Sequence, residues 1–124
     1  MKKNLSNLLG LGITLCMLAQ CQRPSQGEQL YLATCNACHM EDGNGLVDLI
    51  PAFQPEGFET NRKKLICTVV LGINDANTGY FMPRYNTLND ADLANVLNYI
   101  RSLKAESSPA FTDKEIESAR QDCR

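Results

Sequence analysis

The chain has 124 residues, which is enough for one small domain at most once any targeting segment is removed. Its 14 acidic residues outnumber its 12 basic residues, and the net charge is −2. Nucleic acids bind to basic surfaces, so this composition argues against a nucleic-acid partner.

Residues 1–20 have the pattern of a secretory signal peptide. Lys2 and Lys3 precede an apolar run over residues 8–19. That run is too short to span a bilayer, which favours a cleaved signal over a permanent membrane helix. We therefore expect export to the periplasmic side of a bacterial membrane. Cleavage would remove both lysines and lower the net charge from −2 to about −4.

Residues 18–21 read Leu-Ala-Gln-Cys, which resembles a bacterial lipobox, whose cysteine becomes the lipid-modified first residue of the mature protein. Gln20 departs from that pattern, because the residue before the cysteine is usually small. Ordinary secretory cleavage nearby is the alternative, although no Ala-x-Ala site is visible to support it. We expect lipidation of Cys21 to anchor the domain, since several acyl chains hold a protein firmly at a membrane, and residues 21–26 to form a tether.

A helix is expected from Gly27, and it leads into Cys-Asn-Ala-Cys-His at residues 35–39. This C-x-x-C-H run is the attachment signature of a c-type haem. Cys35 and Cys38, three positions apart on one helical turn, can each form a thioether with a haem vinyl group, and His39 then meets the iron as its proximal ligand. His39 is the only histidine in the chain, so no other residue can take this role.

Two other interpretations of the motif are weaker. A thioredoxin-like redox pair belongs near a βαβ pattern, and no strand-rich signal follows here. A zinc site needs four ligands, and Cys35, Cys38 and His39 supply only three, at positions so close that they would crowd one metal.

The segment after the motif is expected to be irregular. A glycine-rich turn at residues 40–45 ends the first helix, and residues 46–55 contain two prolines and no clear periodicity. The ring nitrogen of His39 that does not bind iron needs an acceptor, and a backbone carbonyl of this loop can provide it.

A second helix is expected over residues 61–71, ending at Gly72. Its inward face is apolar and consists of Leu65, Ile66, Val69 and Val70. The basic residues at positions 62–64 oppose the helix dipole in the first turn. We expect them to form a solvated face or, less favourably, to lie beside the haem propionates.

The third helix is the best specified, with Leu88 before the cap candidate Asn89 and basic residues in its last turn. It presents one apolar stripe, made of Leu93, Val96, Leu97, Ile100 and Leu103. Farther on, Thr112 and Glu115 form a capping-box pattern that opens a short helix toward Gln121. No strand-like alternation is visible, so we expect an all-α fold with three to five helices around one prosthetic group.

Two of the six cysteines remain after the others are assigned to the signal peptide, the lipid and the haem. In an exported protein these two, Cys67 and Cys123, are expected to pair. Their disulfide would close a long loop and stabilise the fold by about 4 kcal/mol in the chain-entropy model.

The second axial ligand must come from another residue type, because the chain has one histidine. After signal cleavage the chain keeps Met40 and Met82. Met40 is adjacent to His39 and cannot reach the other face of the ring. Met82 lies in an irregular stretch before Pro83, from which it could present its thioether to the iron, giving His/Met ligation.

Several short motifs follow one another along the chain. They are Gly27-x-x-x-Tyr31-x-x-x-Cys35-x-x-Cys38-His39, Leu49-Ile50-Pro51, Tyr80-Phe81-Met82-Pro83, Leu88-Asn89-Asp90 and Val96-Leu97-Asn98-Tyr99-Ile100. Together they resemble a class I bacterial cytochrome c with one haem c. The resemblance implies the class I cytochrome c fold over residues 27–104, and it implies nothing about the C-terminal extension at residues 105–124.

The resemblance also implies particular contacts. Gly27 and Tyr31 of the first helix are expected to pack against Val96 and Tyr99 of the last. The Pro51 carbonyl is expected to accept a hydrogen bond from His39, and Met82 to be the distal ligand. Three residues are candidates for contact with the haem propionates, namely Arg62, Tyr80 and Arg84.

With both axial positions filled, substrates cannot reach the iron, so we expect outer-sphere transfer of single electrons between redox proteins and no enzymatic activity. The alternative is the haem subunit of a membrane-associated dehydrogenase or reductase complex. An open-site haem sensor or peroxidase is disfavoured by Met82 and Pro83. We expect partners to dock at residues 81–83 and at the turn formed by residues 40–45.

Overall fold

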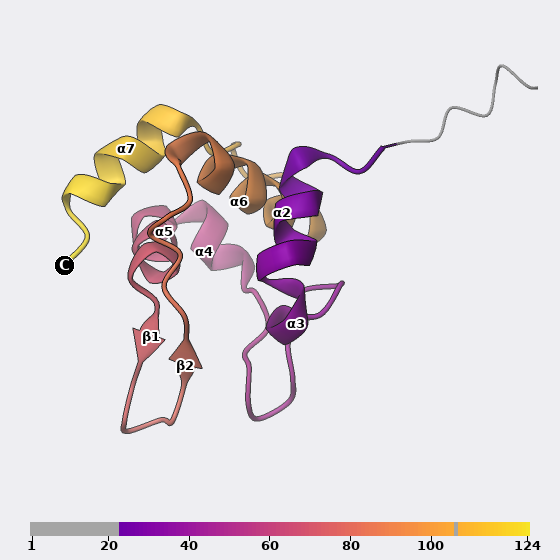
Figure 1. Cartoon of the computed structure of the whole chain (residues 1–124), viewed down its shortest axis with the longest axis vertical. Coiled ribbons are helices and arrows are strands. Elements are labelled where there is room, and N and C mark those ends of the chain that lie inside the picture. Colours follow the sequence, from indigo (N-terminus) through magenta and orange to yellow (C-terminus); the bar gives the residue numbers. More distant parts are fainter. Residues whose placement is uncertain (1–22, 106) are drawn as a thin grey trace, which may run out of the picture.

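The computed structural model describes residues 23–105 and 107–124 (Figure 1). Its elements are α2 (Gln26–Thr34), α3 (Asn36–His39), α4 (Pro55–Glu59), α5 (Arg62–Leu71), β1 (Ile73–Asn74), β2 (Phe81–Met82), α6 (Asp90–Lys104) and α7 (Asp113–Gln121). The expected signal peptide and Cys21 lie outside the described residues. Among the helices in those two ranges, none combines the length and apolar character needed to cross a bilayer.

Helix α2 packs against α6, so the first helix and the last helix of the expected haem domain are in contact (Figure 1). Helix α2 starts one residue earlier than predicted because the Ser25 side chain caps it. At the crossing, a β-carbon on Gly27 would overlap the backbone carbonyl of Asn95. One turn later, the rings of Tyr31 and Tyr99 lie 5.2 Å apart. The expected packing of these two helices is therefore present.

Helices α5 and α6 supply most of the hydrophobic core. The inward residues of α5 are those predicted, except that Leu65 is only partly buried. The predicted stripe of α6 is buried at its first four positions, Leu93, Val96, Leu97 and Ile100. Leu103 is 38% exposed and does not belong to the core.

A small sheet differs from the sequence prediction. Strands β1 and β2 pair antiparallel, with Ile73 opposite Met82 and Asn74 opposite Phe81. Each strand has two residues, too few for an alternation of polar and apolar side chains to reveal it. The short helix α4, which has Pro55 in its first turn, also has no counterpart in the prediction. The fold is mostly helical with one two-stranded sheet, and the expected fold class is correct.

The C-terminal extension forms helix α7, which packs on α5 and α6 (Figure 1). As predicted, the Thr112 hydroxyl caps it by accepting a hydrogen bond from the Glu115 N–H at 3.2 Å. The Glu115 carboxylate binds Arg62 of α5 at 2.6 Å, and the Thr112 backbone N–H, acting as a donor, also contributes to lowering its pKa. A disulfide joins Cys67 of α5 to Cys123, just beyond α7.

Candidate functional site

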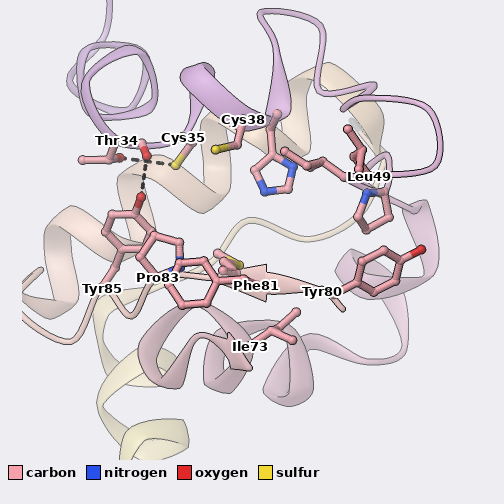
Figure 2. Close-up of a pocket in the computed structure, with 13 residues that line it drawn as sticks. Thr34, Cys35, Cys38, Leu49, Ile73, Tyr80, Phe81, Pro83 and Tyr85 are labelled. Carbon is pink, nitrogen blue, oxygen red and sulfur yellow. Dashed lines mark hydrogen bonds between the residues drawn. The ribbon is translucent and has the colours of Figure 1, made fainter. Parts of the chain in front are cut away.

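The C-x-x-C-H residues lie where α2 ends and the single turn of α3 follows (Figure 2). The His39 N–H donates to the Cys35 carbonyl at 2.9 Å, so the motif forms one helical turn as its spacing predicts. The thiols of Cys35 and Cys38 are both free. Together with the imidazole of His39, they line one cavity.

Two tyrosine hydroxyls fix the ends of the motif. Tyr31 donates to the Met40 carbonyl at 2.5 Å, just after the motif. Burial, followed by the nearby Cys35 thiol, raises the pKa of Tyr31 to about 12, so its hydroxyl keeps its proton and donates at neutral pH. Tyr85 donates to the Thr34 carbonyl at 2.6 Å, just before the motif (Figure 2). The motif is therefore held by α2 and by the segment that follows β2.

The cavity opens between the motif and the β1–β2 hairpin (Figure 2). The non-atom space along its walls, open solvent included, is about 580 Å³. A second space of about 1090 Å³, also counted with open solvent, lies beside α4 and α5 and is called the inner space. His39, Pro51, Ile73 and Met82 line both spaces, so the two adjoin. Both predicted iron ligands, the imidazole and the thioether, thus face the same volume as the two attachment thiols.

His39 faces the cavity with a constrained ring. Burial lowers the pKa of the imidazole, and the Pro51 backbone carbonyl, acting as hydrogen-bond acceptor, partly opposes this shift. The ring is therefore neutral at pH 7, the form that binds metals. The Nδ1 atom of His39 is buried, and no acceptor or donor of the described residues lies within hydrogen-bonding geometry of it. The Phe53 ring stacks on the imidazole, with centroids 4.3 Å apart and planes inclined by 22°.

Met82 belongs to β2 and lines the cavity together with the residues of the motif. Its backbone pairs with Ile73 of β1. Gly72 precedes β1 with φ of 73°, and a β-carbon there would overlap the Met82 carbonyl. Met40, whose carbonyl accepts from Tyr31, lines neither space. The hairpin, an element that the sequence did not reveal, is what brings Met82 opposite the motif.

These groups fit a covalently attached haem. Free thiols, a neutral imidazole and a thioether are the groups that attach and ligate a c-type haem. The walls also leave large apolar side chains uncovered, because Leu49 is 70% exposed and Phe81 is 73% exposed. Exposed apolar surface beside such donors indicates a site that a large apolar group covers.

The predicted propionate contacts lie in three different places. Tyr80 lines the cavity. Arg84 is exposed and lines neither space. Arg62 is turned toward the extension, where Nε and Nη2 bind Glu115 at 2.7 and 2.6 Å and the guanidinium lies 3.7 Å from the centre of the Phe111 ring. Arg62 is therefore not on a solvated face and lines neither space, and its role as a propionate neighbour stays a prediction.

Two residues at the site were missed by the sequence reasoning. The first is Lys64, which lines the inner space. Successive residues of a helix are rotated by about 100° about its axis, so the side chains of residues 62–64 point in three directions and only one of them can face the cavity. That geometry was available from the sequence. Phe53 had no comparable signal, because its contact with His39 depends on how residues 40–53 fold back.

The structure is a small helical domain in which free cysteine thiols, one imidazole and one thioether surround an apolar cavity. These features define the class of proteins that carry a covalently bound haem. The sequence matches the family described as Cytochrome c over residues 24–104, which is more than half of the chain. The chain belongs to the cytochrome c family, whose members bind haem c covalently, and its fold is that of a class I c-type cytochrome.

Similar proteins include cytochrome c subunits of dehydrogenases and cytochrome c6. The chain is 36% identical over 106 residues to the gluconate 2-dehydrogenase cytochrome c subunit of Pantoea cypripedii, covering 77% of this chain and 24% of that protein. It is 29% identical over 101 residues to cytochrome c6 of Cyanidium caldarium, covering 77% and 90%. It is 29% identical over 106 residues to the quinone alcohol dehydrogenase cytochrome c subunit of Gluconobacter oxydans (strain 621H), covering 79% and 22%. The chain thus spans about a quarter of the two dehydrogenase subunits.

Proposed function

We propose that this chain carries single electrons between redox proteins by outer-sphere transfer and catalyses no bond-making reaction. The haem c, when bound, supplies a one-electron iron couple. The observation that supports this function is that His39 and Met82 line the same cavity from two facing walls. His39 and Met82 would then both hold the iron, which would leave no position for a substrate.

Each site residue has a defined role in this proposal. Cys35 and Cys38 form the thioether links, and His39 and Met82 ligate the iron. The Pro51 carbonyl orients the imidazole. A thioether ligand and an apolar surround raise the reduction potential relative to ligation by two nitrogen atoms.

The propionates require polar partners at the edge of the cavity. Tyr80 lines the outer space and Lys64 the inner one, and we assign the contacts to them. Arg84, exposed on the segment after β2, is a weaker candidate because it lines neither space.

Redox partners dock, in this proposal, where the haem edge comes nearest to the surface. Residues 81–83 and the turn at residues 40–45 form this rim. Phe81 is 73% exposed, and Val47, in the loop after the turn, is 90% exposed. Exposed apolar side chains of this kind are typical of surfaces that bind other proteins.

A second candidate function is that of the haem subunit in a membrane-associated dehydrogenase or reductase complex. The names of the relatives from Pantoea cypripedii and Gluconobacter oxydans favour it. The cytochrome c6 relative, of which this chain covers 90%, favours the free carrier. Stable co-purification with a catalytic subunit supports the subunit, whereas a monomer that reduces a terminal oxidase supports the carrier.

The proposed domain organisation places the carrier outside the cytoplasm. Residues 1–20 are a cleaved lipoprotein signal peptide, residues 21–26 a tether, residues 27–104 the haem domain and residues 105–124 its extension. Acylation of Cys21 anchors the protein to a bacterial membrane on the periplasmic side. The lipobox-like sequence Leu-Ala-Gln-Cys at residues 18–21 supports this anchor.

Expression of the full chain together with periplasmic haem-attachment machinery tests these proposals. Intact mass reports one haem and any acyl groups, and the visible spectrum reports the sixth ligand. We expect a mass that includes one haem and several acyl chains, and a low-spin His/Met spectrum. Rapid binding of added carbon monoxide to the ferrous protein would instead indicate an open site and contradict the carrier function.

The Met82→Ala variant tests the distal ligand directly. We expect loss of the ferric thioether absorption band and a lower reduction potential, because water or a nitrogen donor replaces the thioether. Spectroscopy and redox titration measure both. A Met40→Ala variant is the matched control, and it should keep the band, since Met40 lines neither space. An unchanged spectrum in Met82→Ala excludes Met82 as the ligand.

A further inference from the structure

The extension at residues 105–124 lies beyond the part of the chain that matches the cytochrome c family, yet it is strongly attached to that part. Three ion pairs join it to the domain, between Arg62 and Glu115, Lys63 and Asp122, and Asp90 and Arg120. The Cys67–Cys123 disulfide adds a covalent link. These links reach two separate segments of the domain.

The first segment is α5. Arg62 binds both carboxylate oxygens of Glu115, and its side chain is only 17% exposed. An arginine that binds a carboxylate through two nitrogens at a partly buried site forms a strong and well-oriented pair. With the disulfide, this pair fixes α7 at both of its ends along α5.

The second segment is the connection from β2 to α6. Arg120 of α7 donates from Nε to the Asp90 carboxylate at 2.6 Å and from Nη2 to the Leu88 carbonyl. Leu88 belongs to the stretch between Met82 and α6, and its N–H donates to the Tyr85 carbonyl at 3.3 Å. One guanidinium therefore holds both this connection and the first residue of α6.

These two segments are the ones that flank the β1–β2 hairpin (Figure 1). Helix α5 leads through Gly72 into β1, and the stretch after β2 returns to α5, where the Tyr85 N–H donates to the Val69 carbonyl at 3.0 Å. Met82 has its backbone on this hairpin and its side chain at the cavity. Its position therefore depends on how α5 and the β2–α6 connection are held relative to each other, and α7 contacts both.

We propose that the extension acts as a brace that keeps the Met82 thioether against the iron, with Arg120 as a positioning residue that acts through Leu88 and Asp90. This inference rests on the proposed function, in which Met82 is the distal ligand. An added ligand can reach the iron only when Met82 moves away. A looser connection lets that happen more often, so the brace should slow the entry of added ligands.

The test uses the haem-loaded protein and sodium cyanide as the probe of the ferric iron. We expect Arg120→Ala to bind cyanide about tenfold faster than the parent, the effect of losing a hydrogen bond to a charged group. Arg120→Lys should lie between the two, because lysine keeps the charge and can bind one partner but lacks the paired nitrogens. The thioether band should be present at 25 °C in all three proteins and lost at a lower temperature in Arg120→Ala.

Lys63→Ala is the matched control. It removes a cation from another ion pair of the extension, but the Lys63 and Asp122 side chains are 60% and 59% exposed and contribute little. Its cyanide rate should equal that of the parent. An equal increase in Lys63→Ala and Arg120→Ala overturns the positioning role of Arg120.

A parent-like cyanide rate in Arg120→Ala, with the thioether band intact, overturns the brace and leaves Met82 ligation standing. Absence of the band from the parent protein instead refutes Met82 as the ligand and the brace with it. If Arg120→Ala does not fold, the Cys67→Ser/Cys123→Ser variant releases the other attachment. It should also bind cyanide faster, and a parent-like rate there counts against the brace.

Discussion

Position 27 admits no side chain larger than a hydrogen atom. It lies where α2 crosses α6, and a β-carbon added to Gly27 would overlap the Asn95 carbonyl oxygen and lie 3.1 Å from the β-carbon of Tyr99. Backbone atoms of a helix cannot yield as a flexible side chain can, so the two helices would have to separate. The same crossing carries the Tyr31–Tyr99 ring contact beside the haem-attachment motif.

Gly27→Ala should therefore lower the free energy of unfolding by about 1–3 kcal/mol, the usual effect of forcing extra atoms into a packed contact. Thermal or denaturant unfolding of the haem-loaded protein measures this. Ala33→Leu is the control, because Ala33 is an exposed residue of the same helix. It adds more volume and should change stability by no more than about 0.5 kcal/mol. Equal stabilities for Gly27→Ala and the parent would show that the crossing can relax.

Individual residues differ in how far the sequence predicts their place. Cys35, Cys38 and His39 are close in sequence, so local helical geometry alone brings them together. Arg62 is different, because its partner Glu115 lies 53 residues away. Sequence spacing carries no information on which distant carboxylate an arginine will meet, so the pairing of Arg62 with Glu115 could not be predicted.

Among the elements, α7 depends on charge as well as on apolar packing. Its Ile116 and Ala119 are buried, while Glu115 faces Arg62. The hydrogen bond from Arg62 is the main cause of the lowered pKa of Glu115, and its charge contributes further. Because the folded-state pKa lies below the unfolded one, the ion pair stabilises the fold at a pH above the unfolded value of about 4.3. That stabilisation is lost as the pH falls through the folded-state pKa.

Glu115→Gln should remove this part of the pH dependence. At pH 7 we expect the variant to be less stable by about 1 kcal/mol, a value reduced for partial exposure of the carboxylate. As the pH falls below about 4, the difference between variant and parent should shrink toward zero. Urea unfolding at several pH values measures it. Asp42 and Asp75 also have lowered pKa values, because their carboxylates accept hydrogen bonds from the backbone N–H groups of Asn44 and Asn77. Parent and variant both contain these two residues, so their titration cancels in the difference. A difference that stays constant with pH would contradict the assignment.

The helices that the sequence predicts are those whose signals lie within their own residues. Helices α5, α6 and α7 have capping residues or apolar periodicity within their own sequences, and the structure confirms them. The β1–β2 hairpin has neither, because its pairing of Ile73 with Met82 is set by Gly72 and by the return of Tyr85 to α5. The prediction of Met82 as the distal ligand therefore rests on elimination and not on recognition of the element that carries it.

The whole molecule consists of two parts with different sources of stability. The residues that form the core come mainly from α2, α5, α6 and α7 and pack on one another. The walls of the cavity, at residues 40–53 and in the hairpin, expose large apolar side chains such as Val47, Leu49 and Phe81. The haem is expected to cover part of this apolar surface when it is bound and so to stabilise the walls.

The Cys35→Ala/Cys38→Ala variant, which cannot attach haem, should separate the two parts. Without the haem, amide groups of α2, α5, α6 and α7 should keep their protection from hydrogen exchange, because the core cluster and the Cys67–Cys123 disulfide are unaffected. Residues 40–53 and the hairpin should open with free energies of about 0–1 kcal/mol, against several kcal/mol for the helices. Hydrogen exchange read by mass spectrometry of peptides measures both regions. The haem-loaded parent is the control, and it should protect the two regions alike. Complete loss of protection in the variant would mean that the helices depend on the haem as much as the cavity walls do.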